Sequence, residues 1–184
     1  MATVVGEPES RARHLALAAT TADAATISAL DAAADQAASR GAPGAAAELL
    51  ELAIGLGDDT VLRRLRAAEL HFRAGSLPAA GRILPSDIDA VPPGPLRCLA
   101  LMLSGAMHAY DDDLVAAVEA MSRALDEAGS DPALGALCSM RLALGLHMIG
   151  RFPDAVGHAR AAVDLAEIVG VPGLRSQALS LLVT

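Results

Sequence analysis

The chain contains no lysine and no tryptophan, and its 184 residues include one tyrosine and two phenylalanines. Without lysine there can be no P-loop lysine, Schiff-base lysine or Ser–Lys dyad. The scarcity of aromatic side chains disfavours base-stacking platforms and aromatic cages. A formal net charge of −8 further disfavours nucleic-acid binding, because phosphate contacts need clustered basic residues. We therefore expect no direct contact with nucleic acid.

The sequence has neither a signal-peptide pattern at its N-terminus nor an apolar run long enough to span a membrane. Its two cysteines, Cys98 and Cys138, are far apart and have no CxxC pattern or histidine at ligand spacing. They are interpreted as buried thiols in a reducing compartment, and neither as a zinc site nor as a disulfide. The sequence thus predicts a cytoplasmic protein without membrane contact, metal or cofactor.

Alanine and leucine supply most of the hydrophobic residues, which make up 53% of the chain. Both are strong helix formers, as are the arginines and glutamates that accompany them. No stretch shows the alternating, β-branched pattern that is typical of a strand. Clusters of glycine, proline and aspartate divide the chain into helix-sized segments. The expected fold class is all-α.

Four of the turns share one pattern: a turn residue, an apolar residue or proline two positions on, and an alanine three further. The four are Gly41-x-Pro43-x-x-Ala46, Gly75-x-Leu77-x-x-Ala80, Asp112-x-Leu114-x-x-Ala117 and Gly150-x-Phe152-x-x-Ala155. Twelve residues before each alanine is another small residue: Ala34, Ala68, Gly105 and Ala143. Small residues at facing positions let two antiparallel helices approach closely. The alanines recur every 34 to 38 residues, a period typical of two-helix solenoid repeats.

The repeats predict a helical domain over residues 23–184, preceded by a lead-in segment, 1–22, with a helix at about 8–19. The predicted helix pairs are 23–40/43–57, 60–74/77–90, 95–110/113–129 and 131–149/152–170. A ninth helix, 172–184, would open an incomplete fifth repeat. The return helix of the second pair should end near Leu84, because Pro85 and a polar run follow it. The alternative is an irregular alanine-rich bundle with accidental periodicity.

The repeats resemble the tetratricopeptide repeat (TPR), although the early tryptophan is absent and the aromatic slots hold mostly leucine, alanine or histidine. The expected architecture is a TPR-like α-solenoid of about four antiparallel helix pairs with extra terminal helices. The chain also resembles the helical-repeat region of the large ATP-binding LuxR-type transcriptional regulators, relatives of the maltose-operon activator. This second resemblance is carried by residues 13–19, 68–75, 92–97, 110–114, 128–134 and 158–166.

The resemblance implies that a parent protein couples effector sensing and ATP-dependent assembly to transcription, with this chain as its sensor or scaffold region. The ATPase module and the C-terminal helix-turn-helix of that family are not in the sequence, so we expect a fragment or a truncated paralogue. The alternative is a free-standing TPR-like module for protein interaction or homo-oligomerisation. No motif orders a catalytic serine, histidine and acid. We therefore expect no enzyme; a small-molecule pocket among the histidines is the alternative.

The first helices of solenoid pairs line a concave inner face. Those at 95–110 and 131–149 are apolar almost all round, so every side of them must be covered. Either the superhelix fills its own groove, or a protein segment, an apolar effector, a second copy or the parent's other domains dock there. In the first repeat Ser28, Asp31 and Asp35 interrupt the apolar stripe. The predicted groove residues are Leu62, Leu65, Phe72, Leu99, Met102, Leu137, Met140, Leu144 and His147.

Two polar groups have a structural and a functional interpretation. Asp111–Asp113 is interpreted as a helix start, where carboxylates face the positive end of the helix dipole; a divalent-cation site is the alternative. His71 and His108 occupy the same repeat position, and His147 is one position off. We interpret each as filling an aromatic slot near a helix C-terminus. A paired site across adjacent repeats is the alternative.

Overall fold

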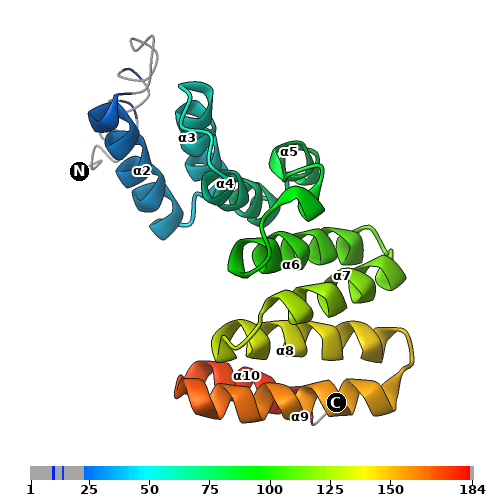
Figure 1. Ribbon diagram of the computed structural model, residues 1–184. Coiled ribbons are helices and arrows are strands. Elements are labelled where there is room, and N and C mark those ends of the chain that lie inside the picture. Colours follow the sequence, from blue (N-terminus) through cyan, green and yellow to red (C-terminus); the bar gives the residue numbers. More distant parts are fainter. Residues whose placement is uncertain (1–9, 11–13, 15–22, 183–184) are drawn as a thin grey trace, which may run out of the picture. The chain divides into compact units, whose positions relative to one another are not determined.

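The structure is a computed structural model that describes residues 10, 14 and 23–182 (Figure 1). Within residues 23–182 all regular elements are helical, which confirms the all-α prediction. They are α2 (Ala24–Ser39), α3 (Pro43–Gly55), α4 (Val61–Arg73), α5 (Leu77–Ile83), a 3-10 turn η1 (Ile88–Ala90), α6 (Pro95–Tyr110), α7 (Leu114–Glu127), α8 (Pro132–Met148), α9 (Phe152–Val169) and α10 (Pro172–Ser180).

Local sequence signals explain where the helices begin and end. The Asp131 carboxylate accepts hydrogen bonds from the backbone amides of Ala133 and Leu134 at 2.9 and 3.1 Å, which caps α8. Pro132 occupies the first turn, where the missing amide proton costs nothing. Gly170 ends α9 in the left-handed conformation, with a φ of 71°. Caps of this kind place most of the helix ends within two residues of their predicted positions.

Two predicted helices differ from the structure. The segment 77–90 is not one helix: α5 ends at Ile83, close to the expected Leu84, and a separate 3-10 turn follows. At the C-terminus α10 ends at Ser180, so the predicted helix 172–184 is too long. The predicted helix at about 8–19, within the lead-in segment 1–22, lies almost entirely outside the described residues.

The chain divides into two compact units, Met1–Ser86 and Asp87–Thr184. The first contains α2 to α5, and the second contains η1 and α6 to α10. The boundary follows the second pair, whose return helix has only 7 residues. In the second unit α6, α7, α8 and α9 are neighbours in that order, and α10 packs on α9 (Figure 1). The extent of one repeat domain over 23–184 stays a prediction.

The small residues of the repeat pattern lie inside the helix pairs. Each pair consists of two neighbouring helices joined by a short turn, and all eight small residues of the pattern are buried. They are Ala34, Ala46, Ala68, Ala80, Gly105, Ala117, Ala143 and Ala155. Side chains this small let the two helix backbones approach closely. The close packing of the helix pairs therefore depends on the alanine-rich composition.

Gly105 on α6 is the one glycine among these positions, and replacing it with alanine is expected to lower stability. A Cβ there would be 3.2 Å from the Ala117 carbonyl oxygen and 2.7 Å from the Met121 Cε. The methionine can move, but the α7 backbone must shift. We expect this overpacking to cost about 1–3 kcal/mol of unfolding free energy, more than the helix propensity gained from alanine. Urea unfolding followed by circular dichroism measures the loss.

The matched control is Gly157→Ala on α9, where an added Cβ would meet no atom within 4 Å. Here only the gain in helix propensity remains, and stability should rise by about 0.5–1 kcal/mol. Equal gains in the two variants would contradict the close approach of α6 and α7.

Candidate functional site

In the first unit the two aspartates that interrupt the apolar stripe, Asp31 and Asp35, are ion-paired. The Arg63 Nη2 lies 2.7 Å from the Asp31 Oδ2 of α2, and the same guanidinium contacts the Asp58 carboxylate. Burial alone would lower the pKa of Arg63, but the hydrogen bonds to Asp31 and Asp58 outweigh burial and raise it. Arg66 forms a further pair with Asp35. The Asp31 and Asp35 pairs join α2 to α4, the first helices of consecutive repeats, so the surface there is polar and ion-paired.

The structure distributes the three predicted groove residues of the first unit over different environments. Leu62 is exposed, Phe72 is half-buried, and Leu65 is buried in the interior. Leu65 is thus a core residue of its unit. The ion pairs between α2 and α4 involve the same helix as these three residues. The first unit therefore presents no continuous apolar surface at the predicted positions.

In the second unit α6 is covered by its own neighbours. Its buried residues lie on all sides of the helix: Cys98, Ala100, Leu101, Met102, Leu103 and Gly105. Met102 is therefore a core residue, whereas Leu99 keeps an exposed side chain. An all-round apolar helix needs cover on every side, and for most of α6 the fold itself supplies it.

The next first helix, α8, leaves one stretch open. Leu137 and Met140 are half-buried, but Leu144 is 51% exposed and His147 is exposed. Leu144 and His147 border a groove of about 510 Å³ between α8, α9 and the end of α10. We refer to it as the α8–α10 groove. Its lining residues are Ala143, Leu144, His147, Phe152, Ala155, Val156, Ser180, Leu181 and Leu182.

An aromatic contact connects α8 and α9 at the groove. The rings of His147 and Phe152 meet edge to face, with centroids 5.1 Å apart and an interplanar angle of 74°. The Phe152 side chain is nevertheless 55% exposed, and Val156, one turn along α9, is 41% exposed. Apart from His147 and Ser180, the groove is therefore lined by apolar residues, several of which remain in contact with water.

Phe152, Val156, Leu181 and Leu182 are groove residues that the sequence analysis missed, because it assigned the surface to the first helices alone. A usable signal was present. Phe152 and Val156 are four residues apart and share one face of α9. Phe152 is the first residue of α9 and follows the short turn after α8, whose last turn contains His147.

The aspartate cluster has a structural role at the turn between α6 and α7. Asp113 caps α7, with its Oδ1 accepting from the Ala116 amide at 3.1 Å, as the helix-start interpretation predicts. Asp111 is the C-terminal cap residue of α6. The Nδ1 of His108 lies 4.0 Å from the Asp113 Oδ2.

The histidines near helix C-termini have different partners. His71 is buried in the last turn of α4, and its Nε2 contacts the Glu51 carboxylate of α3. His147 contacts Phe152.

Within the described part of the chain, no three histidine, cysteine or acidic side chains gather as a metal-binding group. None of the described helices has the length and hydropathy that a membrane span requires.

Comparison with solved structures identifies the architecture. The crystal structure of MamA matches 81% of this chain and 90% of its own chain, with a TM-score of 0.58 and 16% sequence identity. The crystal structure of the APC/C hetero-tetramer Cut9–Hcn1 matches 96% of this chain and 37% of its own, with a TM-score of 0.64 and 15% identity. Both are TPR-like helical-repeat proteins. The fold is a TPR-like α-solenoid.

The TPR-like fold confirms the coarser of the two resemblances. No protein-family profile matches the chain, and no curated protein matches it at a significant level. Identities of 15–16% establish the fold alone, because one solenoid fold serves many unrelated functions.

Proposed function

We propose that this chain is a non-enzymatic, TPR-like interaction scaffold, and that its α8–α10 groove binds an apolar segment of another protein. The observation that supports this is the set of apolar side chains left in water around one concave surface, with Leu144, Phe152 and Val156 at its wall. Of the predicted groove residues, Leu144 and His147 belong to this surface.

The driving force would be burial of apolar area. Covering exposed apolar surface contributes about 25 cal/mol per Å², and aromatic or aliphatic side chains in a central pocket supply most of the affinity of an interface. The contact with His147 restrains the Phe152 ring before a partner arrives. A pre-positioned ring loses less side-chain entropy on binding than a free one.

We favour a different protein over a second copy as the occupant. Each copy carries a formal net charge of −8, and two such copies repel one another. The groove is open and spread over three helices, which suits a peptide or helix better than a small enclosed effector. Homo-oligomerisation remains the alternative function, and a dimer at high concentration in light scattering would favour it.

We further propose that the scaffold is the sensor region of a cytoplasmic LuxR-type transcriptional regulator. The support is the sequence resemblance of segments such as 68–75, 128–134 and 158–166. In that setting the partner would be another domain of the parent protein, and binding would shift how those domains assemble. The genomic reading frame tests this: an ATPase module upstream and a helix-turn-helix downstream are expected.

Val156→Asp is expected to weaken partner binding at least about tenfold, which corresponds to about 1.4 kcal/mol. The new carboxylate would lie in the apolar wall, where a bound partner removes water from it. Partners are first identified by affinity purification with the full chain. The dissociation constant is then measured with each purified partner by titration calorimetry.

Val115→Asp on α7 is the matched control. Val115 is a helical valine with 70% exposure, and it lies outside the groove lining. Binding should be unchanged in this variant, and both variants should keep the wild-type helical content. Equal affinity of the two variants for every identified partner would show that the groove is not the binding surface.

A further inference from the structure

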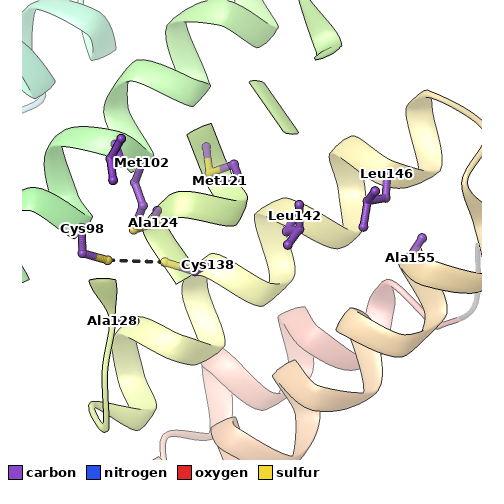
Figure 2. Close-up of a cluster of buried hydrophobic side chains, with 10 residues drawn as sticks. Cys98, Met102, Met121, Ala124, Ala128, Cys138, Leu142, Leu146 and Ala155 are labelled. Atoms are coloured by element: carbon purple, nitrogen blue, oxygen red, sulfur yellow. Dashed lines mark hydrogen bonds between the residues drawn. The ribbon is translucent and has the colours of Figure 1, made fainter. Parts of the chain in front are cut away.

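Cys98 and Cys138 meet in the core of the second unit. Cys98 lies in the first turn of α6, and Cys138 lies in the second turn of α8. Both residues are fully buried, and their Sγ atoms are 3.5 Å apart (Figure 2). The two residues are 40 positions apart in the sequence, and both are free thiols here.

We propose that this pair is a site of two-electron oxidation, at which a peroxide converts the two thiols into a disulfide that links α6 to α8. Forming the bond requires an S–S distance of about 2.0 Å, so the sulfur atoms must approach by about 1.5 Å. Rotation about the Cα–Cβ bonds moves sulfur on this scale.

The surrounding core can accommodate the adjustment. Met102, Met121, Ala124 and Ala128 belong to the same buried cluster as the two cysteines (Figure 2). Methionine side chains are flexible and fill irregular space, and the alanines present only methyl groups. Moving the two sulfur atoms together therefore disturbs no rigid or charged neighbour within this cluster.

The chemistry balances with a peroxide as the oxidant. One cysteine loses its thiol proton, and its thiolate attacks a peroxide oxygen. The O–O bond breaks, a sulfenic acid forms, and the departing hydroxide takes up the released proton to give one water. The second Sγ then displaces the sulfenic hydroxyl, which leaves as a second water with the second thiol proton. Two thiols and one hydrogen peroxide thus give one disulfide and two waters.

Both thiols are poor nucleophiles while the helices stay closed. Burial raises the pKa of the Cys98 thiol, and the hydrogen bond with Cys138 partly offsets the rise. Burial and the adjacent Cys98 sulfur raise the pKa of Cys138 to about 12. Because both thiols are buried, oxidation has to wait for local opening of the helices, and we expect it to be slow.

The test treats the reduced full-length chain with hydrogen peroxide, followed by alkylation in denaturant, trypsin digestion and mass spectrometry without reductant. Trypsin cuts here only after arginine, because the chain has no lysine, and so the two cysteines fall in separate peptides, 98–123 and 124–141. The expected product is these two peptides joined, within a monomer lighter by two hydrogen atoms. Its melting temperature should rise and return to the starting value with dithiothreitol.

Single variants Cys98→Ala and Cys138→Ala serve as controls and should form no linked peptide within a monomer. Three results would overturn the proposal: alkylation of both thiols after prolonged treatment, over-oxidation of both cysteines without a link, or links between separate chains. The melting temperature of the untreated variants shows that they fold, so a missing link cannot be ascribed to an unfolded control.

Discussion

Replacing Leu49 with alanine is expected to destabilise the first unit by about 2–5 kcal/mol, which is the largest single effect that we predict. Leu49 lies on α3, the return helix of the first pair, and its side chain is fully buried. The substitution removes buried methyl groups and leaves a cavity that close-packed helices fill only in part. A domain whose total stability is about 5–15 kcal/mol loses a large share of it.

The matched control is Leu62→Ala in the same unit. Leu62 is 51% exposed, so the same substitution removes little buried surface and should change stability by no more than about 0.5 kcal/mol. Urea unfolding gives the free energies, and hydrogen exchange in α2 to α4 assigns the change to the first unit. Equal losses in the two variants would mean that Leu49 is not packed as the structure places it.

Much of the fold could be predicted from the sequence because the signals are local. Asp131 and Pro132 mark the start of α8. The carboxylate accepts hydrogen bonds from unpaired amides of the first turn, and proline has no amide proton to leave unpaired. Pro85 predicted the early end of α5. The predicted C-terminal end of α10 was wrong by a few residues, because no glycine or proline marks the end of this helix in the sequence.

The pairing of helices could be predicted for a different reason. A small residue at a fixed distance on either side of each turn, such as Ala34 and Ala46, is needed wherever two backbones approach closely. This requirement repeats with the fold, so it appears as a period in the sequence. The side chains at those positions are indeed buried, including Gly105, where even a methyl group would collide with α7.

The groove was harder to predict, because it depends on which side chains the fold leaves uncovered. The repeat pattern placed both Met102 and Leu144 on the predicted inner face, yet the structure buries Met102 and exposes Leu144. Periodicity gives the direction of a side chain on its own helix. It does not give the cover that neighbouring helices provide, and for the same reason it missed Phe152 and Val156 on α9.

The adjacency of Cys98 and Cys138 was also beyond the sequence analysis, although their burial was predicted. The two lie near the starts of α6 and α8, the first helices of consecutive pairs. Neighbouring first helices of a solenoid stack side by side, but a meeting of two sulfur atoms requires matching depth and rotation of both helices. The depth and rotation of α6 and α8 depend on how both helices pack against α7. No short sequence pattern predicts them.

The same two thiols predict that the second unit loses stability in alkali, by about 3 kcal/mol at pH 11. Burial holds the pKa of Cys138 near 12, whereas an exposed thiol has a pKa of about 9. Between these values the unfolded chain has released a proton that the folded chain retains. The stabilisation is therefore complete below pH 9 and falls as the pH rises towards 12, and the raised pKa of Cys98 acts in the same direction.

The absence of lysine simplifies this measurement, because no lysine ammonium group titrates across the same range. Urea unfolding at several pH values between 8 and 11 measures the slope for the reduced chain. The variant with both Cys98→Ala and Cys138→Ala should have a flatter profile. Tyr110 is present in both proteins, so the difference between their profiles reports the thiols alone. Parallel profiles would show that the two sulfur atoms reach water in the folded chain, which would contradict the buried contact between α6 and α8.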